Sequence, residues 1–146
     1  MANWPEVRTE APDLAAAVEA RLSAAKHHVL ATLRRDGSPR VSGTEVELGP
    51  DGLHLGSMWK AVKARDLQRD ARFALHVNPG DGSMAGGDAK LSGTAVEVTD
   101  HPAAGQSHLF RLDVTEVVLT SIHPDGDRLL IETWRPGEGV RQVDRR

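Results

Sequence analysis

Residues 53–77 read LHLGSMWKAVKARDLQRDARFALHV and predict a strand, then a cationic turn and helix, then a second strand. The helical segment spans residues 59–69, and Lys60 and Lys63 lie three residues apart near its start. The first turn of a helix offers free backbone N–H groups and the positive end of the helix dipole, and both favour a negative ligand. The stretch therefore predicts an anion site suited to a phosphate.

Periodic patterns predict the elements on either side of this unit. Apolar residues at i, i+4 and i+8 indicate a first helix that Asp13 caps and that runs to about residue 25. Alternating segments bounded by turn signals predict strands over residues 28–34, 39–48, 53–57, 73–78, 90–99, 109–122 and 128–134. Residues 79–88 hold four glycines in ten residues and predict a mobile loop beside a site.

The links between these strands have hairpin length, which favours antiparallel pairing. We therefore expect a mainly β (α+β) fold, an antiparallel split β-barrel with an N-terminal helix and a helix between strands 3 and 4. The chain has 146 residues, which is the size of one domain spanning residues 1–146.

Charge and composition exclude several classes of function. Lys and Arg number 18 against 21 Asp and Glu, so we expect no nucleic-acid partner and no membrane partner. The absence of cysteine excludes disulfides and thiolate chemistry. The N-terminus lacks an export signal, and no apolar run could span a membrane, so we expect a cytoplasmic protein.

The histidines do not predict a metal site. None of the seven shows the i, i+3 or i, i+4 spacing of a helical metal pair. His54 and His76 flank the cationic helix on predicted strands, and they are the first candidates if haem binds. The sequence also lacks a GxSxG motif, which argues against a hydrolase.

Three motifs together carry a family resemblance. They are ATLRRDGSPRVS at residues 31–42, LHLGS at 53–57 and KARDLQRDARFALHV at 63–77. In this order they resemble the pyridoxamine 5'-phosphate oxidase-like superfamily of split β-barrel flavoproteins. The C-terminal WRPGEGVRQVDR is similar to the W…G…R-x-x-D-R ending of the true oxidases, with one extra residue.

The resemblance implies FMN as the cofactor, with coenzyme F420 as the alternative, and a homodimer with two sites at the subunit interface. Lys60 and Lys63 would take the phosphate, while Trp134 and Arg141 would reach the flavin held by the neighbouring subunit. The residues that would run along the isoalloxazine ring and ribityl chain are Arg40, Val41, Ser42, Thr44, Gly56 and Ser57.

Two departures from the family pattern bear on activity. Ala61 and Val62 stand where FMN binders commonly place Ser-Arg, and Val143 stands near the substrate histidine of the authentic oxidases, which argues against pyridoxamine phosphate oxidation. We expect an oxidoreductase that uses FMN or F420 to transfer a hydride to or from a small-molecule substrate. A non-catalytic flavin or deazaflavin carrier and a haem-binding split-barrel protein remain the alternatives.

Overall fold

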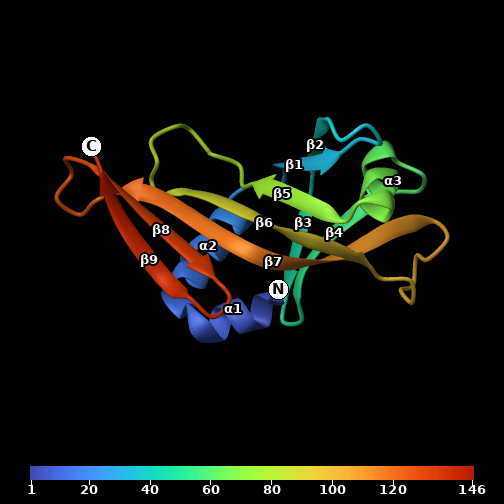
Figure 1. The fold of residues 1–146 in the computed structure, drawn as a ribbon, viewed down its shortest axis with the longest axis horizontal. Helices are drawn as coiled ribbons and strands as arrows, with labels where there is room; N and C mark the ends of the chain where they lie inside the picture. Colours follow the sequence, from blue (N-terminus) through green and yellow to red (C-terminus); the bar gives the residue numbers. More distant parts are fainter.

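A nine-stranded antiparallel sheet dominates the computed structural model, which describes all 146 residues (Figure 1). Helices α1 (Trp4–Glu10) and α2 (Pro12–Ser23) precede the sheet, and helix α3 (Val62–Arg69) interrupts it. The strands are β1 (His28–Leu33), β2 (Pro39–Thr44), β3 (Val46–Gly49), β4 (Gly52–Met58), β5 (Arg72–His76), β6 (Asp88–Glu97), β7 (Ser107–Ile122), β8 (Leu129–Arg135) and β9 (Gly139–Arg145). No helix is long and apolar enough to cross a membrane.

Strand β7 organises the sheet because it pairs with three other strands. The strand order is β2-β1-β5-β6-β7-β4-β3, and β8 pairs with β7 and β9. Residues 107–111 of β7 pair with β4, whereas residues 117–122 pair with β8. Between these two partners, Ala2 exchanges backbone hydrogen bonds with Val114 at 2.9 and 2.7 Å. The N-terminal residues thus occupy the gap where the barrel splits.

A bulge in β6 lets the long β6–β7 hairpin curve. The register shifts between Ser92 and Gly93, and a Cβ atom at position 93 would overlap the Asp113 carbonyl. Only glycine permits this close approach of two strands. The β6–β7 pair thereby supplies the curved wall on which the rest of the barrel closes.

The two N-terminal helices close one side of the barrel. Asn3 caps α1 by accepting the Glu6 backbone N–H at 3.0 Å, and α2 starts at Pro12, after Ala11. Asp13 is therefore in the first turn of α2 and is not its cap, which corrects the expected start. The sequence patterns missed α1, because seven residues are too few to show a helical period.

The barrel core is one cluster of 25 buried apolar residues from the helices and both parts of the sheet. Trp4 and Trp134 are its largest side chains, and both are fully buried. Leu, Val and Ala supply most of the remaining core, as a chain with two Phe and no Tyr requires. Trp134 is therefore a core residue of its own subunit.

The structure differs from the sequence-based expectations in four further places. The predicted strand 39–48 is divided at Glu45 into β2 and β3, α3 starts at Val62 three residues later than expected, and β9 was not predicted. The glycine-rich loop 79–88 packs on α2, where Arg21 donates to the carbonyl oxygens of Ala85 and Asn78 at 2.9 and 3.4 Å. Figure 1 places this loop away from α3, so it is not beside the groove described below.

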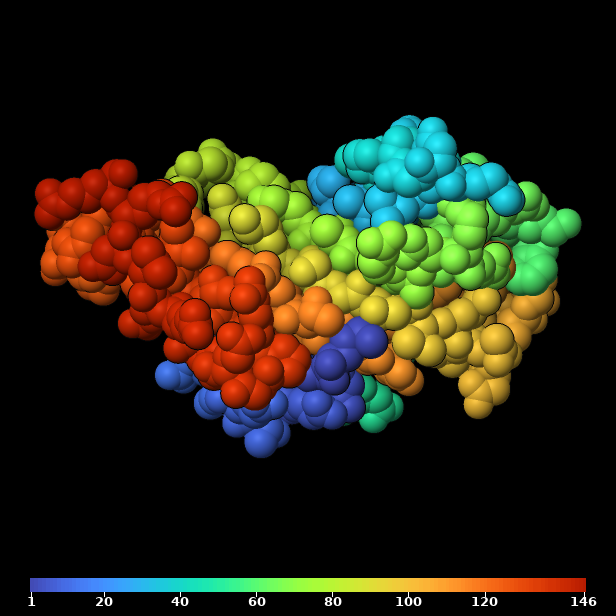
Figure 2. Space-filling model, viewed as in Figure 1, coloured from blue at the N-terminus to red at the C-terminus, as the bar shows by residue number.

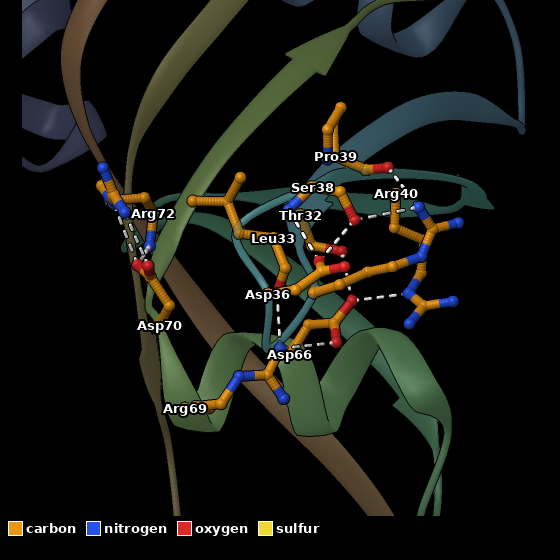
Figure 3. A network of polar contacts seen from close by, with 11 residues as sticks. Thr32, Leu33, Asp36, Ser38, Pro39, Arg40, Asp66, Arg69, Asp70 and Arg72 are labelled. Carbon is orange, nitrogen blue, oxygen red and sulfur yellow. Dashed lines mark hydrogen bonds and ion pairs between the residues drawn. The ribbon is translucent and has the colours of Figure 1, made fainter.

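A buried carboxylate joins α3 to the first two strands (Figure 3). Asp66 is 2% exposed; its Oδ2 accepts hydrogen bonds from Thr32 Oγ1 at 2.8 Å and Arg40 Nε at 2.7 Å. Its Oδ1 accepts from Arg69 Nη2 at 3.0 Å, and Arg69 also donates to the Leu33 carbonyl. Burial alone would raise the pKa of Asp66, but the hydrogen bonds from Arg40, Thr32 and Arg69 outweigh it and lower that pKa below 3.8.

We expect Asp66→Asn to lower the free energy of unfolding by about 2 kcal/mol, because two guanidinium groups lose their charged partner. This value lies below that for a fully buried pair, since the Arg40 and Arg69 side chains are 28% and 31% exposed. Urea denaturation at pH 7 measures the change. The difference from the wild type should shrink as the pH falls below about 4, where the Asp66 carboxylate takes up a proton first in the unfolded chain and then, at lower pH, in the folded one.

The matched control is Asp70→Asn, which removes a carboxylate one helical turn away that pairs with the exposed Arg72. That variant should change stability much less than Asp66→Asn. Equal effects of the two variants would contradict the anchoring role of Asp66.

Candidate functional site

A groove of about 760 Å³ opens between β2, β4 and the turn that leads into α3. We call it the β2–β4 groove. Its lining residues are His27, Gly43, Thr44, Glu45, Glu47, Gly56, Ser57, Met58, Trp59, Ala61, Lys63, Gln106 and Ser107. Residues from four separate stretches of sequence thus meet at one surface.

The walls of the groove are formed partly by bare backbone. Nothing lies within 4 Å of the position that a Cβ atom would take at Gly43 or at Gly56. Thr44 and Ser57 follow these glycines, and both are buried at the base. A flat ligand could therefore lie against β2 and β4 and meet backbone groups directly.

Lys63 supplies a cation at the helical end of the groove. Its Nζ donates to the Gly43 carbonyl at 3.0 Å, so the side chain crosses from α3 to β2. Burial lowers the pKa of Lys63 below 10.5, and the nearby Glu45 carboxylate partly offsets this shift. Helix α3 has no side-chain cap at its N-terminus, so the N–H groups of its first turn remain available beside this cation.

The turn of residues 58–61 forms the outer lip of the groove. Met58 and Trp59 are 81% and 47% exposed, which is unusual for large apolar side chains in a monomer. Lys60 follows with φ +63°, a left-handed conformation that non-glycine residues rarely adopt. Such a turn needs outside contacts to hold its shape.

The structure brings together only part of the predicted site. Thr44, Gly56, Ser57 and Lys63 line the groove as expected. The remaining residues are elsewhere. Lys60 is exposed on the turn, and Val41 is 71% exposed on β2. Ser42 is half-buried and lines neither the groove nor the neighbouring depression that is described next.

Arg40 lies in a neighbouring depression of about 890 Å³ that we call the arginine hollow. Its lining residues are Arg34, Arg35, Asp36, Arg40, Val62, Arg65, Asp66, Gln68 and Arg69. Five arginines face two aspartates there, and Asp66 fixes two of the five guanidinium groups (Figure 3). Asp36 accepts from Ser38 instead of an arginine. The hollow therefore carries a net positive charge in a protein whose net charge is −3.

Trp134 and Arg141 lie on the C-terminal hairpin of β8 and β9, at the other end of the molecule from α3 (Figure 1). Trp134 is fully buried in the core of this chain, and its contact with a cofactor in a neighbouring subunit stays a prediction. Arg141 is exposed on β9, which leaves it free to contact another molecule.

Sequence patterns missed several residues of the groove. Gln106 and Ser107 enter it because β7 pairs with β4 in a register that places Ser107 opposite Met58. This pairing joins strands that are not consecutive, so no local pattern reveals it. Trp59 was open to prediction, because tryptophan is enriched at binding surfaces relative to the rest of a protein surface.

The chemistry of the groove favours binding over nucleophilic catalysis. Ser57 Oγ donates to the neighbouring Met58 carbonyl, so it has no base to activate it. The ionisable side chains that line the groove are His27, Glu45, Glu47 and Lys63. A groove with backbone walls, an exposed tryptophan and one anchored lysine suits a flat ligand with an anionic end.

Solved structures resemble this fold over most of its length. A pyridoxamine 5'-phosphate oxidase-related, FMN-binding protein from Nostoc punctiforme PCC 73102 has a TM-score of 0.67 and 11% identity, with 93% of this chain and 96% of that chain covered. PhzG from Burkholderia lata 383, in complex with tetrahydrophenazine-1-carboxylic acid, has a TM-score of 0.64 and 16% identity, with coverage of 95% and 91%.

A third similar structure is HutZ, the haem storage protein from Vibrio cholerae, with a TM-score of 0.53, 17% identity and coverage of 72% of this chain and 89% of that chain. No protein-family model matches this sequence, and no curated protein matches it. The structural likeness confirms the fold expected from the sequence: the chain has an antiparallel split β-barrel with the fold of these solved structures.

Proposed function

We propose that this chain is an oxidoreductase that binds FMN or coenzyme F420 in the β2–β4 groove and acts on a small molecule. The observation that carries the proposal is the groove itself, with open backbone walls at Gly43 and Gly56 and a lysine at the uncapped start of α3. The FMN-binding neighbour of the same fold adds support.

Each part of the groove has a role in this proposal. Lys63 and the first-turn N–H groups of α3 hold the phosphate through charge-assisted hydrogen bonds. Thr44 and Ser57 offer hydroxyl groups to the polar edge of the ring system, and Trp59 shields one side from water. The cofactor, once bound, supplies the hydride chemistry, so the protein needs no catalytic triad.

We expect the fluorescence of FMN or F420 to be quenched or otherwise to change when the cofactor is titrated with the purified protein. Lys63→Met, which keeps most of the aliphatic stem and removes the charge, should weaken the bound cofactor by about 1–3 kcal/mol. Arg72→Ala removes a cation from an exposed strand position outside both cavities, and it should leave the affinity unchanged. Binding of neither cofactor below about 100 μM would contradict the proposal.

The arginine hollow favours F420 over FMN. Arg40 and Thr44 are four residues apart on β2, so about 13 Å separates the hollow from the base of the groove. A ligand whose ring lies in the groove can reach the hollow with its anionic end, and the hollow has more guanidinium groups than one phosphate can occupy. F420 carries carboxylates beyond its phosphate, whereas FMN does not.

The double variant Arg35→Ala/Arg65→Ala separates these two cofactors. Both arginines line the hollow, and neither side chain makes a hydrogen bond or ion pair within the protein, so the fold should tolerate their loss. We expect F420 affinity to fall about tenfold or more and FMN affinity to change much less. An equal effect on both cofactors, measured by the same titration, would leave FMN as the better candidate.

We further propose that the chain forms a homodimer through the face of the sheet opposite the helices. Strands β5, β6 and β7 reach the surface there (Figure 2), around a depression of about 260 Å³ that includes Val29, Ala31, Ala74 and Val118. Val29 is 43% exposed in the monomer. A second copy on this face could bring the exposed Arg141 near the groove of its partner.

We expect light scattering to report a dimer for the wild type and a monomer for Val29→Glu, because a charge on this apolar face opposes association. Ala16→Glu places the same charge on the exposed side of α2 and should remain dimeric. A monomeric wild type, or two variants that behave alike, would exclude this interface.

A further inference from the structure

A buried histidine outside the groove holds the turn that forms its lip. His108 is 7% exposed on β7, and its Nε2 accepts the Lys60 backbone N–H at 3.1 Å. On the other side of the ring, Nδ1 lies 2.7 Å from Glu97 Oε2. Gln68 Nε2 of α3 donates to the same carboxylate at 3.0 Å. A chain of hydrogen bonds thus runs from α3 and β6 through His108 to the turn.

The partners of His108 determine which nitrogen carries the proton. A backbone N–H can only donate, so Nε2 of His108 must be the acceptor in the bond from Lys60. The Glu97 carboxylate can only accept, so Nδ1 carries the hydrogen. This arrangement requires the neutral ring with its hydrogen on Nδ1.

The same ring also orders the side chain next to Lys60. Trp59 stacks on His108, with ring centroids 4.6 Å apart and an interplanar angle of 14°. His108 is paired with Ser57 in the β4–β7 register, so the ring is fixed to the strand that enters the turn. The left-handed φ of Lys60 is therefore held by contacts from one side chain.

We propose that His108 is a positioning residue that controls ligand binding in the β2–β4 groove through its protonation state. Protonation turns Nε2 into a donor, which cannot accept the Lys60 N–H, so the turn loses the bond that holds it. Acid pH then loosens the lip at Trp59 and Lys60 and lowers the affinity of the groove for its ligand. This inference rests on the proposed function only for the identity of that ligand.

Three other charged or titratable residues lie around His108. Glu97 on β6 faces Nδ1, and the Lys60 side chain is exposed on the turn. His101, from the β6–β7 connection, lines the same small cavity of about 160 Å³ as His108 and Trp59. The test therefore needs a control variant at His101 as well.

The test compares the affinity for FMN and for F420 at pH 8 and at pH 5.5 in the wild type and in His108→Gln. Glutamine can accept the Lys60 N–H and does not titrate in this range. Between pH 8 and pH 5.5, we expect the wild type to lose about fivefold more affinity than the variant. This factor corresponds to the loss of one hydrogen bond. The phosphate of either cofactor contributes equally in both proteins, so the comparison isolates His108. His101→Gln should retain the wild-type dependence.

A second measurement needs no cofactor. Hydrogen exchange of the Lys60 amide, expressed as a protection factor, should fall from pH 8 to pH 5.5 in the wild type and stay constant in His108→Gln. If His108→Gln does not fold, Glu97→Gln replaces it. Loss of the carboxylate disfavours the protonated ring, so this variant should lose Lys60 protection at a lower pH than the wild type.

Equal pH dependence of affinity in the wild type and His108→Gln, or constant protection of Lys60 in the wild type, would overturn the role of His108. If the wild type binds neither cofactor at any pH, the proposed function fails instead. The exchange measurement then still decides whether His108 holds the turn.

Discussion

The buried carboxylate of Asp66 is the interaction on which the β2–β4 groove and the arginine hollow depend. It accepts hydrogen bonds from β1, from β2 and from its own helix, and it is 2% exposed. An unpaired buried carboxylate would be costly, so α3 and β2 must keep the arginines Arg40 and Arg69 in contact with it. The position of β2 against α3 then sets where Lys63 meets the Gly43 carbonyl.

Two polar networks hold α3, and both attach to its C-terminal half. Asp66 and Arg69 attach its C-terminal half to β1 and β2, whereas the His108–Glu97–Gln68 chain connects its polar face to the turn before it. The residues of these networks do not line the groove, but their hydrogen bonds reach β2 and the Lys60 turn, which border it. Such supporting contacts keep the binding residues of a site in place.

The family-like motifs and the structure agree on the unit of residues 53–77. Alternation predicted β4 and β5. Of the two lysines expected at the helix start, only Lys63 is in the first turn of α3, because the helix starts at Val62. No sequence pattern marked Asp66 as buried, because a charged residue gives no local sign of burial. Trp134 lies in the core, and a tryptophan near a chain end fits a core or an interface equally well.

By itself, the sequence determined the fold class, the order of most elements and the helix that carries Lys63, because hydrophobic period and turn residues are local signals. Tertiary structure alone decided which distant residues share the groove. Gln106 and Ser107 enter through the register of β4 with β7, Arg40 turns to the hollow through its bond to Asp66, and His108 reaches the Lys60 turn across 48 residues of chain. Strand register and buried polar pairing depend on the whole sheet, so they have no signature in any single segment.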